Sequence, residues 1–546
     1  LVIFGQMLEA KAHQKTGNAI KELMNLSPKE AHLIHNNVEK NIPISEVKIG
    51  DILKVKPGEK IPVDGEIIEG NTTIDESMIT GEPIPAEKKM GDKITSGTIN
   101  GNQVFLMKTE KIGKDTLLSQ IIEMVNSASR SKAPIQKLTD KVSKIFVPVV
   151  MVISVLTFVF WYIFGGENRA IFALVNALAV LIVACPCALG LATPMSVMVG
   201  IGKGARNGIL IKNAEALEEM EKVNVIITDK TGTLTEGKPS LTQIFTENIP
   251  ENEAMQFAAS LNKNSEHPLS QAVLDKAKFF ASAQNDNLKE VKNFKNISGR
   301  GILGEIDGKK LFLGNIHYLK ENNFEISENL LQKAQILEND ANTVSYLTID
   351  GKAVAVFGFK DKIKENAKSA IQFLKNKGIE IMMMTGDNEA TAKSVAETLG
   401  IKKYIANCLP QDKINQVKDL QNQGKIVAMT GDGINDAPAL AQANVGIAMG
   451  TGTDIAMNSA EITLLKGDIS GVAKSKILSE KMMKNVKENL FFAFAYNTLG
   501  IPIAAGLLYP IFGILLSPMF AAAAMSFSSV SVIANSLRLN NVKLKI

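Results

Sequence analysis

Long apolar runs are confined to two blocks of the chain, residues 145–209 and 490–537. The sequence around them is rich in Lys and Glu and carries only short hydrophobic stretches. A helix needs about 20 apolar residues to cross the core of a bilayer. The pattern therefore predicts a multi-pass membrane protein with four spanning segments: Ile145–Phe164, Ile171–Ile201 with Pro186 and Pro194 inside it, Leu490–Tyr509, and Ile511–Leu537.

The polar parts of the chain change their periodicity along the sequence. Residues 7–35 have apolar positions at helical spacing and predict a stalk, whereas 36–115 consist of short strands broken by Gly and Pro. Between the two apolar blocks, three hydrophobic strands end in polar Gly/Asp turns, at 225–229, 379–387 and 426–432. Such runs are typical of buried parallel strands, whose carboxyl ends form the site of an open α/β sheet.

We therefore expect an α-helical transmembrane region, an all-β domain, and an α/β domain with an inserted α+β domain. The predicted boundaries are 1–35 for the end of a membrane helix and the stalk, 36–118 for the β domain, 119–209 for a stalk and two membrane helices, 210–242 and 348–475 for the α/β domain, 243–347 for the insert, and 476–546 for the last two membrane helices. The chain opens on the apolar stub Leu1–Phe4 without an initiator Met or a signal peptide. We interpret this stub as the tail of a membrane helix in an N-terminally truncated chain.

Charge excludes one class of partner and suggests an orientation. The chain has 60 basic and 56 acidic residues, a net charge of +4, so nothing indicates nucleic-acid binding. Lysines flank the apolar blocks, which places the flanks and the large polar domains on the cytoplasmic side. The three cysteines, Cys185, Cys187 and Cys408, are too few for a disulfide framework.

The heptapeptide Asp229-Lys230-Thr231-Gly232-Thr233-Leu234-Thr235 follows the first strand and is the most specific string in the chain. A carboxylate at a strand end can attack a phosphoryl group and form an aspartyl-phosphate. Asp432 and Asp436 follow another strand and supply oxygens suited to Mg²⁺, together with Asp229 and Thr231. Thr385 and Lys413 are candidates to bind the transferring phosphoryl group. An isolated Asp-Gly pair is often a simple turn, but three successive strand ends with this heptapeptide favour a catalytic site.

The heptapeptide resembles the phosphorylation motif of P-type ATPases within a haloacid-dehalogenase-like domain, and Thr80-Gly81-Glu82 is similar to the actuator motif of that family. The resemblance covers the whole chain in order. It implies that Asp229 accepts the γ-phosphoryl group of ATP and that Glu82 later positions the hydrolytic water. Thr231 stands where related phosphatases carry a second Asp, so the aspartyl-phosphate is expected to persist until Glu82 arrives.

Two strings in the insert resemble the nucleotide-binding domain of the heavy-metal branch of this family: Ser265-Glu266-His267-Pro268, and Gly299–Gly304 with Gly314-Asn315. The resemblance implies ATP contacts from Glu266, His267, Gly299, Gly301 and Asn315. On its own, the glycine pattern is weak and a lone His is more often structural. The branch commonly has Glu five residues before the His, where this chain has Asn262.

Cys185-Pro186-Cys187 lies inside the second spanning segment and resembles the signature of heavy-metal P-type ATPases. The Pro frees backbone groups at membrane depth, and thiolates there need a soft cation. No Asp, Glu or His occurs within 490–537. Tyr496-Asn497 and Met525 through Ser529 are instead similar to the copper(I) branch. A set of two thiolates and one thioether suits Cu(I), with Ag(I) as its mimic. In that branch Glu9 and Asp140 match acids that receive incoming metal, and solvated charges at helix ends explain them equally well.

The sequence thus predicts a P-type ATPase that exports Cu(I), uses ATP and Mg²⁺, and lies in a membrane with its catalytic domains in the cytoplasm, most simply the bacterial inner membrane. Membrane lipid and a copper-donating chaperone are the expected partners, and a monomer is expected. Three alternatives stay open at this point: a Zn(II)/Cd(II) exporter, a membrane-tethered phosphatase, and a metal-sensing scaffold without turnover.

Overall fold

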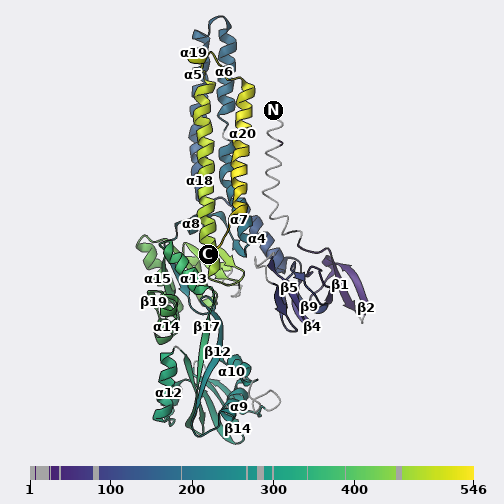
Figure 1. The fold of residues 1–546 in the computed structure, drawn as a ribbon, viewed down its shortest axis with the longest axis vertical. Coiled ribbons are helices and arrows are strands. Elements are labelled where there is room, and N and C mark those ends of the chain that lie inside the picture. Colours follow the sequence, from purple (N-terminus) through teal and green to yellow (C-terminus); the bar gives the residue numbers. More distant parts are fainter. Residues whose placement is uncertain are drawn as a thin grey trace. The chain divides into compact units, whose positions relative to one another are not determined.

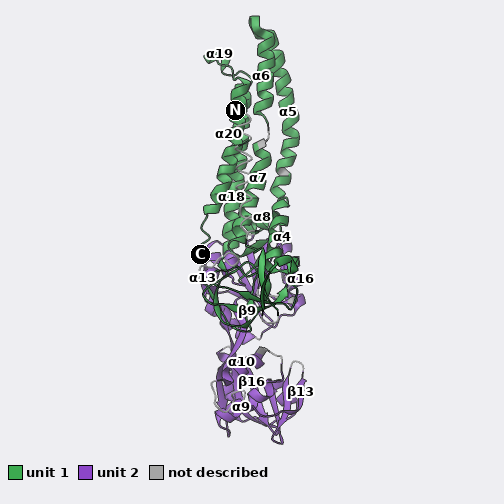
Figure 2. Ribbon diagram, turned by 90° about the vertical axis from the view of Figure 1, so that its right-hand side faces the viewer, with its two compact units in different colours: residues 1–222, 460–466, 474–546 green, residues 223–459, 467–473 purple. Residues whose placement is uncertain are grey.

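The structure is a computed structural model that describes residues 7, 24, 26–35, 38–77, 85–185, 187–265, 268–278, 288–297, 300–340, 342–387, 389–450 and 458–546, without the side chains of Leu138, Cys187 and Ile434. The chain divides into two compact units (Figure 2). The first comprises residues 1–222, 460–466 and 474–546, and the second comprises residues 223–459 and 467–473.

The N-terminal part of the first unit is a small β domain. Its six-stranded antiparallel sheet has the order β2-β1-β3-β9-β4-β7, and a second sheet has the order β6-β5-β8. Alternating residues such as Leu53, Val55, Phe105 and Met107 point into one core. The strands are β1 (Glu30–His35), β2 (Val38–Pro43), β3 (Ile52–Val55), β4 (Asp64–Glu69), β5 (Thr72–Asp75), β6 (Ala86–Lys88), β7 (Lys93–Ile94), β8 (Ile99–Asn100) and β9 (Phe105–Lys111).

The first strand corrects one sequence prediction. Residues 7–35 were expected to form a helical stalk, but Glu30–His35 is β1 and pairs with β2 and β3. The hydrophobic periodicity of this segment alone does not reveal a strand, because the strands that pair with it lie later in the chain. Most of 7–25 lies outside the described residues.

Long helices make up the rest of the first unit and run side by side (Figure 1). They include α5, which contains Pro148, and α18. The antiparallel pair β10 (Ile209–Ile211) and β22 (Ile462–Leu464) also belongs to this unit. The helices are α4 (Leu117–Arg130), α5 (Pro134–Phe164), α6 (Arg169–Val183), α7 (Cys187–Ala205), α8 (Ala214–Lys222), α18 (Ser470–Ala504), α19 (Tyr509–Phe512) and α20 (Pro518–Leu537).

Within the described part of the chain, three helical stretches are long and apolar enough to cross a membrane: Thr139–Phe164, Gly166–Ala205 and Pro518–Asn541. The predicted span Leu490–Tyr509 is not among them, because its helix α18 starts in charged sequence and already ends at Ala504. The last predicted span begins later than expected, at Pro518 instead of Ile511. Gly506 and Gly513 have positive φ angles of 100° and 66°, so the chain turns between the two helices.

The second unit contains five parallel strands, in the order β21-β20-β11-β18-β19. All three central strands are apolar and buried, as the sequence predicts. Their carboxyl ends therefore meet at one edge of the sheet. The strands are β11 (Val225–Asp229), β18 (Glu380–Met384), β19 (Lys403–Ile405), β20 (Val427–Gly431) and β21 (Val445–Met449), and the helices of this domain are α13 (Ala367–Asn376), α14 (Glu389–Leu399), α15 (Pro410–Asn422) and α16 (Ala437–Gln442).

The insert is a six-stranded antiparallel sheet of order β12-β17-β16-β15-β14-β13 with its own helices. The paired strands β12 and β17 extend beyond both predicted limits of the insert and join it to the parallel sheet. Its elements are β12 (Thr235–Thr246), β13 (Lys292–Ile297), β14 (Gly301–Ile306), β15 (Lys309–Gly314), β16 (Thr343–Ile349), β17 (Lys352–Ile363), α9 (Glu251–Asn262), α10 (Pro268–Ala277), α11 (Ile316–Glu321) and α12 (Glu328–Asn339).

Candidate functional site

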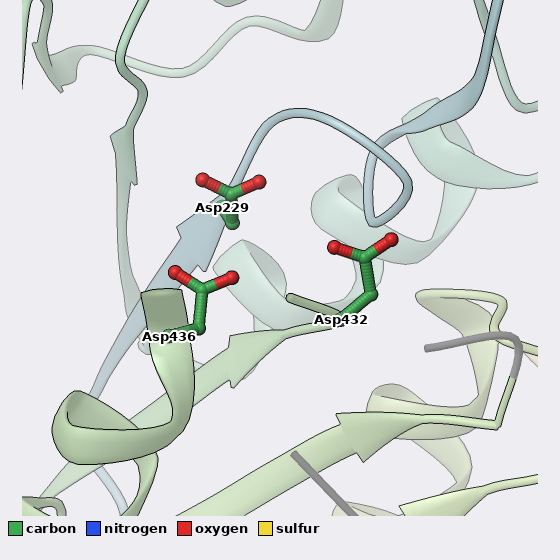
Figure 3. A group of neighbouring side chains, drawn as sticks. All are labelled: Asp229, Asp432 and Asp436. Atoms are coloured by element: carbon green, nitrogen blue, oxygen red, sulfur yellow. The ribbon is translucent and has the colours of Figure 1, made fainter. Parts of the chain in front are cut away.

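Three carboxylates meet at the carboxyl edge of the parallel sheet. Asp229 ends β11, Asp432 follows β20, and Asp436 lies in the single 3₁₀ turn after it (Figure 3). One oxygen of each lies within 4.8 Å of the others. Among the described residues this is the one cluster of His, Cys, Asp and Glu close enough to hold a metal ion.

Lys413 on α15 lies between two of these carboxylates. Its Nζ donates to Asp229 Oδ1 at 2.5 Å and to Asp436 Oδ1 at 2.6 Å. All three side chains are at most 10% exposed. A buried cation held by two carboxylates is positioned to stabilise negative charge on a group bound at Asp229.

Burial sets the protonation of this cluster. The pKa of Asp229 is raised to about 7, chiefly by burial; Lys413 opposes this rise, and the neighbouring Asp436 and Asp432 add to it. The pKa of Asp432 is raised for the same reason, chiefly burial and then Asp436. Although burial opposes it, the pair of carboxylates raises the pKa of Lys413, so this residue stays a cation. A divalent cation would favour the ionised carboxylates.

The loop after Asp229 approaches the cluster closely. Gly232 has φ +69°, and a Cβ atom there would lie 1.7 Å from Asp432 Oδ2. Lys364 also holds the loop, because its Nζ donates to the main-chain carbonyls of Gly232, Thr233 and Gly467. Sequence reasoning missed Lys364, since a Lys just after a strand carries no signal of a contact more than a hundred residues away.

The other two predicted residues of this site, Thr385 and Thr231, belong to the same sequence motifs, and within the described part of the chain neither forms a hydrogen bond with the three carboxylates. Thr385 is buried just after β18, and its hydroxyl bonds to Asp387 Oδ2 at 3.0 Å. Asp387 in turn forms an ion pair with Lys230 of the heptapeptide, a partner that the sequence did not suggest. Thr231 is exposed at the start of the loop.

The donor set fits Mg²⁺. Three carboxylates converge, and hard oxygen ligands with excess negative charge are what this ion prefers. Asp229, Asp432 and Asp436 would hold it, with Lys413 balancing the remaining charge. Thr231 stays a predicted fourth contact.

The insert contains a cavity of about 310 Å³ on the side of β14–β16. Gly301 and Asn315 line it, together with Asn262, Arg300 and Gly314. A Cβ at Gly301 would lie 2.4 Å from the carbonyl oxygen of Leu313, so a side chain does not fit there. The Asn315 side chain accepts from Tyr318 N and caps α11. The two predicted nucleotide-binding residues that the structure describes, Gly301 and Asn315, thus line the same pocket.

A second cavity, of about 370 Å³, lies among the long helices of the first unit. Cys185 lines it from the break between α6 and α7, Tyr496 and Asn497 from α18, and Met525 from α20. Ser528 lines it, whereas the predicted Ser529 is buried but does not. The structure thus gathers four predicted metal ligands that the sequence places up to 340 residues apart.

Several predicted residues fall outside the part of the chain that the structure describes, and one lies at the surface. Glu9, Glu82, Glu266, His267 and Gly299 lie outside the described residues, as does the side chain of Cys187. Asp140 forms an exposed ion pair with Lys132 at 3.6 Å.

Comparison with known proteins matches the β domain and the α/β domain to separate family models. Residues 25–126 match the model of the P-type ATPase actuator domain, and 223–444 match that of haloacid dehalogenase-like hydrolases. The copper-exporting P-type ATPase of Legionella pneumophila subsp. pneumophila (strain Philadelphia 1) is 51% identical over 545 residues, which cover 100% of this chain and 73% of the relative. The chain belongs to the copper-transporting P-type ATPases. It is therefore a membrane protein of a family of ATP-hydrolysing translocases.

Other relatives agree. The copper-transporting P-type ATPase of Rhizobium leguminosarum bv. viciae is 50% identical over all of this chain and 64% of its own length. The silver exporting P-type ATPase of Salmonella typhimurium is 49% identical over all of this chain and 66% of its own length. The chain thus spans about two thirds of the length of these two relatives. A solved zinc-transporting PIB-type ATPase in its E2.Pi state has 28% identity and a TM-score of 0.64, covering 98% of this chain and 86% of that one.

Proposed function

We propose that this P-type ATPase exports Cu(I) from the cytoplasm, and that Asp229 carries the phosphoryl group during the cycle. The observation that supports this most is the cavity lined by Cys185, Tyr496, Asn497 and Met525. A reduced sulfur and a thioether with neutral oxygen donors suit a soft monovalent ion, and Ag(I) has the same preference. None of the four residues is a carboxylate or His, which zinc sites usually employ.

The phosphoryl transfer uses the cluster at the edge of the parallel sheet. A carboxylate oxygen of Asp229 attacks the γ-phosphorus of ATP, the bond from that phosphorus to the bridging oxygen breaks, and ADP leaves with the electron pair. Lys413 stabilises the charge on the transferred group, because its ammonium lies 2.5 Å from Asp229 Oδ1. Bound Mg²⁺ would neutralise phosphoryl oxygens beside the same carboxylates. ATP itself is assigned to the pocket lined by Gly301 and Asn315.

Hydrolysis of the aspartyl-phosphate completes the cycle. Water attacks phosphorus, the bond to the Asp229 carboxylate breaks, and inorganic phosphate leaves. We assign the positioning of this water to Glu82, and the exposed Thr231 supplies no acid or base of its own. We place the catalytic domains in the cytoplasm, since lysines at 132, 137, 141 and 144 precede the apolar run of α5 that begins at Ile145. A copper-donating protein as partner and a monomeric state belong to the same proposal.

The deciding experiment measures acid-stable phosphoenzyme from γ-labelled ATP in the full-length protein, with a non-chelating reductant and a panel of metals. We expect label with Cu(I) and Ag(I), none with Zn²⁺, and none in Asp229→Asn. Label driven by Zn²⁺ would retain the role of Asp229 and overturn the assignment of the cavity to copper. ATP-independent hydrolysis of small phosphoesters would favour the phosphatase alternative.

A further inference from the structure

A buried polar network lies one layer away from the metal cavity. It consists of five side chains from three helices, and we call it the asparagine network: Ser196 on α7, Asn485 and Asn489 on α18, and Asn535 and Ser536 on α20. Each is at most 6% exposed. Buried polar groups are costly unless they find hydrogen-bond partners. At the edge of the network, Asn535 also bonds to Glu488 and Arg538.

Asn489 is the centre of this network. Its Nδ2 donates to Ser196 Oγ and to Ser536 Oγ, both at 2.9 Å, so one amide group bonds to α7 and α20 at once. Its Oδ1 accepts from Asn535 Nδ2 at 2.9 Å. Both functions of the amide are therefore satisfied by neighbouring helices.

The other members close the network. Asn485, one turn from Asn489 on the same helix, accepts from Ser196 Oγ at 2.8 Å and donates to the main-chain carbonyl of Asn535 at 2.9 Å. The hydroxyls of Ser196 and Ser536 lie 3.3 Å apart. A network with every amide satisfied specifies one mutual register of three helices, because a shift of any of them leaves a buried polar group unpaired.

Two of these helices, α18 and α20, carry predicted metal ligands that line the cavity, and Cys185 lines it from the segment just before α7. Along α18 the cavity residues Tyr496 and Asn497 stand two turns from Asn489, roughly 10 Å along the axis. An apolar layer separates the two sets and excludes direct contact: Ala188, Leu189, Ala192, Ala493 and Val532. The cavity, this layer and the asparagine network therefore follow one another along α18 and α20 and, from Cys185 onward, along α7.

We propose that Asn489 is a positioning residue for metal binding, acting through the register of α7, α18 and α20. It touches no ligand of the cavity, but it fixes α18 and α20, which carry Tyr496 and Met525, and α7, which begins two residues after Cys185. This inference rests on the proposed copper export. Removing residues that orient the ligands of a metal without binding it typically lowers metal affinity by about tenfold or more.

The test uses the full-length protein under reducing conditions. Asn489→Leu keeps the volume and removes the amide, and the Ser196→Ala/Ser536→Ala double variant removes two partners and keeps both asparagines. The matched control is Ser154→Ala, because Ser154 is also buried and bonds between helices, to the Ala177 carbonyl at 2.9 Å. The readouts are the Ag(I) dissociation constant from chelator competition without ATP, the Ag(I) concentration for half-maximal phosphoenzyme, and binding of an ATP analogue.

We expect both metal readouts to weaken by about tenfold in Asn489→Leu. The double variant is expected to weaken less, and the control to match wild type. ATP-analogue binding involves the other unit and should stay unchanged in all variants, which shows that the second unit is folded. A cooperative thermal transition reports on the folding of the helices. If the metal readouts of Asn489→Leu and of the double variant are unchanged and only thermal stability falls, the network serves stability alone and the proposal is wrong. Absence of metal-dependent phosphoenzyme in wild type would instead overturn the proposed function, and the chelator competition would still report on the network.

Discussion

A Cβ atom on Gly232 would lie 1.7 Å from Oδ2 of Asp432. These two residues are 200 positions apart in the sequence. The glycine also has φ +69°, where a side chain costs about 1–2 kcal/mol. The phosphorylation loop can thus approach the carboxylate only without a side chain at this position.

Gly232→Ala is therefore expected to displace Asp432 and to lower phosphoenzyme formation by more than about tenfold. Misplacing a catalytic group by about 1 Å can reduce a reaction rate by at least this factor. Labelling from γ-labelled ATP measures it. Gly378→Ala is the control, because Gly378 has φ +77° with nothing within 4 Å of the added atom. Equal activity of both variants would contradict the steric explanation.

Lys413→Met leaves Asp229 and Asp436 without their shared cation. Breaking a buried pair in this way costs about 3 kcal/mol or more, and phosphoenzyme should fall to background. The loss of thermal stability without Mg²⁺ should be larger at pH 8 than at pH 5, because the Asp229 carboxyl, whose pKa burial raises, is protonated more readily at the lower pH. The exposed Lys418 on the same helix provides the control Lys418→Met. A pH-independent loss would show that Lys413 acts by packing alone.

The raised pKa of Asp229, about 7, predicts a pH-dependent stability. A carboxyl with a raised folded-state pKa contributes stability that is fully present below its unfolded pKa and is lost as the pH rises through 7. Each pKa unit corresponds to about 1.4 kcal/mol. Without Mg²⁺, the melting temperature of Asp229→Asn should therefore exceed that of wild type by an amount that grows between pH 4 and 7. A difference that stays constant over this range would contradict the shifted pKa.

Met525→Leu removes the thioether from the metal cavity and nearly conserves its volume, a change that costs less than about 1.5 kcal/mol of stability. We expect Ag(I) affinity to fall by about tenfold while ATP-analogue binding is unchanged. Met151→Leu, at an exposed position on α5, should change neither. Wild-type Ag(I) affinity in Met525→Leu, measured by chelator competition, would remove Met525 from the ligand set.

The sequence alone determined the parts whose signal is local. The strand ending at Asp229 is an uninterrupted apolar run followed by a specific heptapeptide, and the strand before Asp432 has the same form, so both could be placed without knowledge of the fold. The apolar runs around Cys185 and Met525 likewise predicted membrane helices. By contrast, the sequence placed β1 in a helix and started α20 seven residues too early.

Only the tertiary structure decided what meets across the chain. Lys413 lies between Asp229 and Asp436, Lys364 binds the loop carbonyls, and Asn489 joins three helices, because separate strands and helices bring these side chains together. The physical reason is the range of the interactions. Hydrophobic periodicity and a strand-end motif depend on neighbours within a few residues, whereas hydrogen bonds, ion pairs and close packing depend on distances in space that no local pattern records.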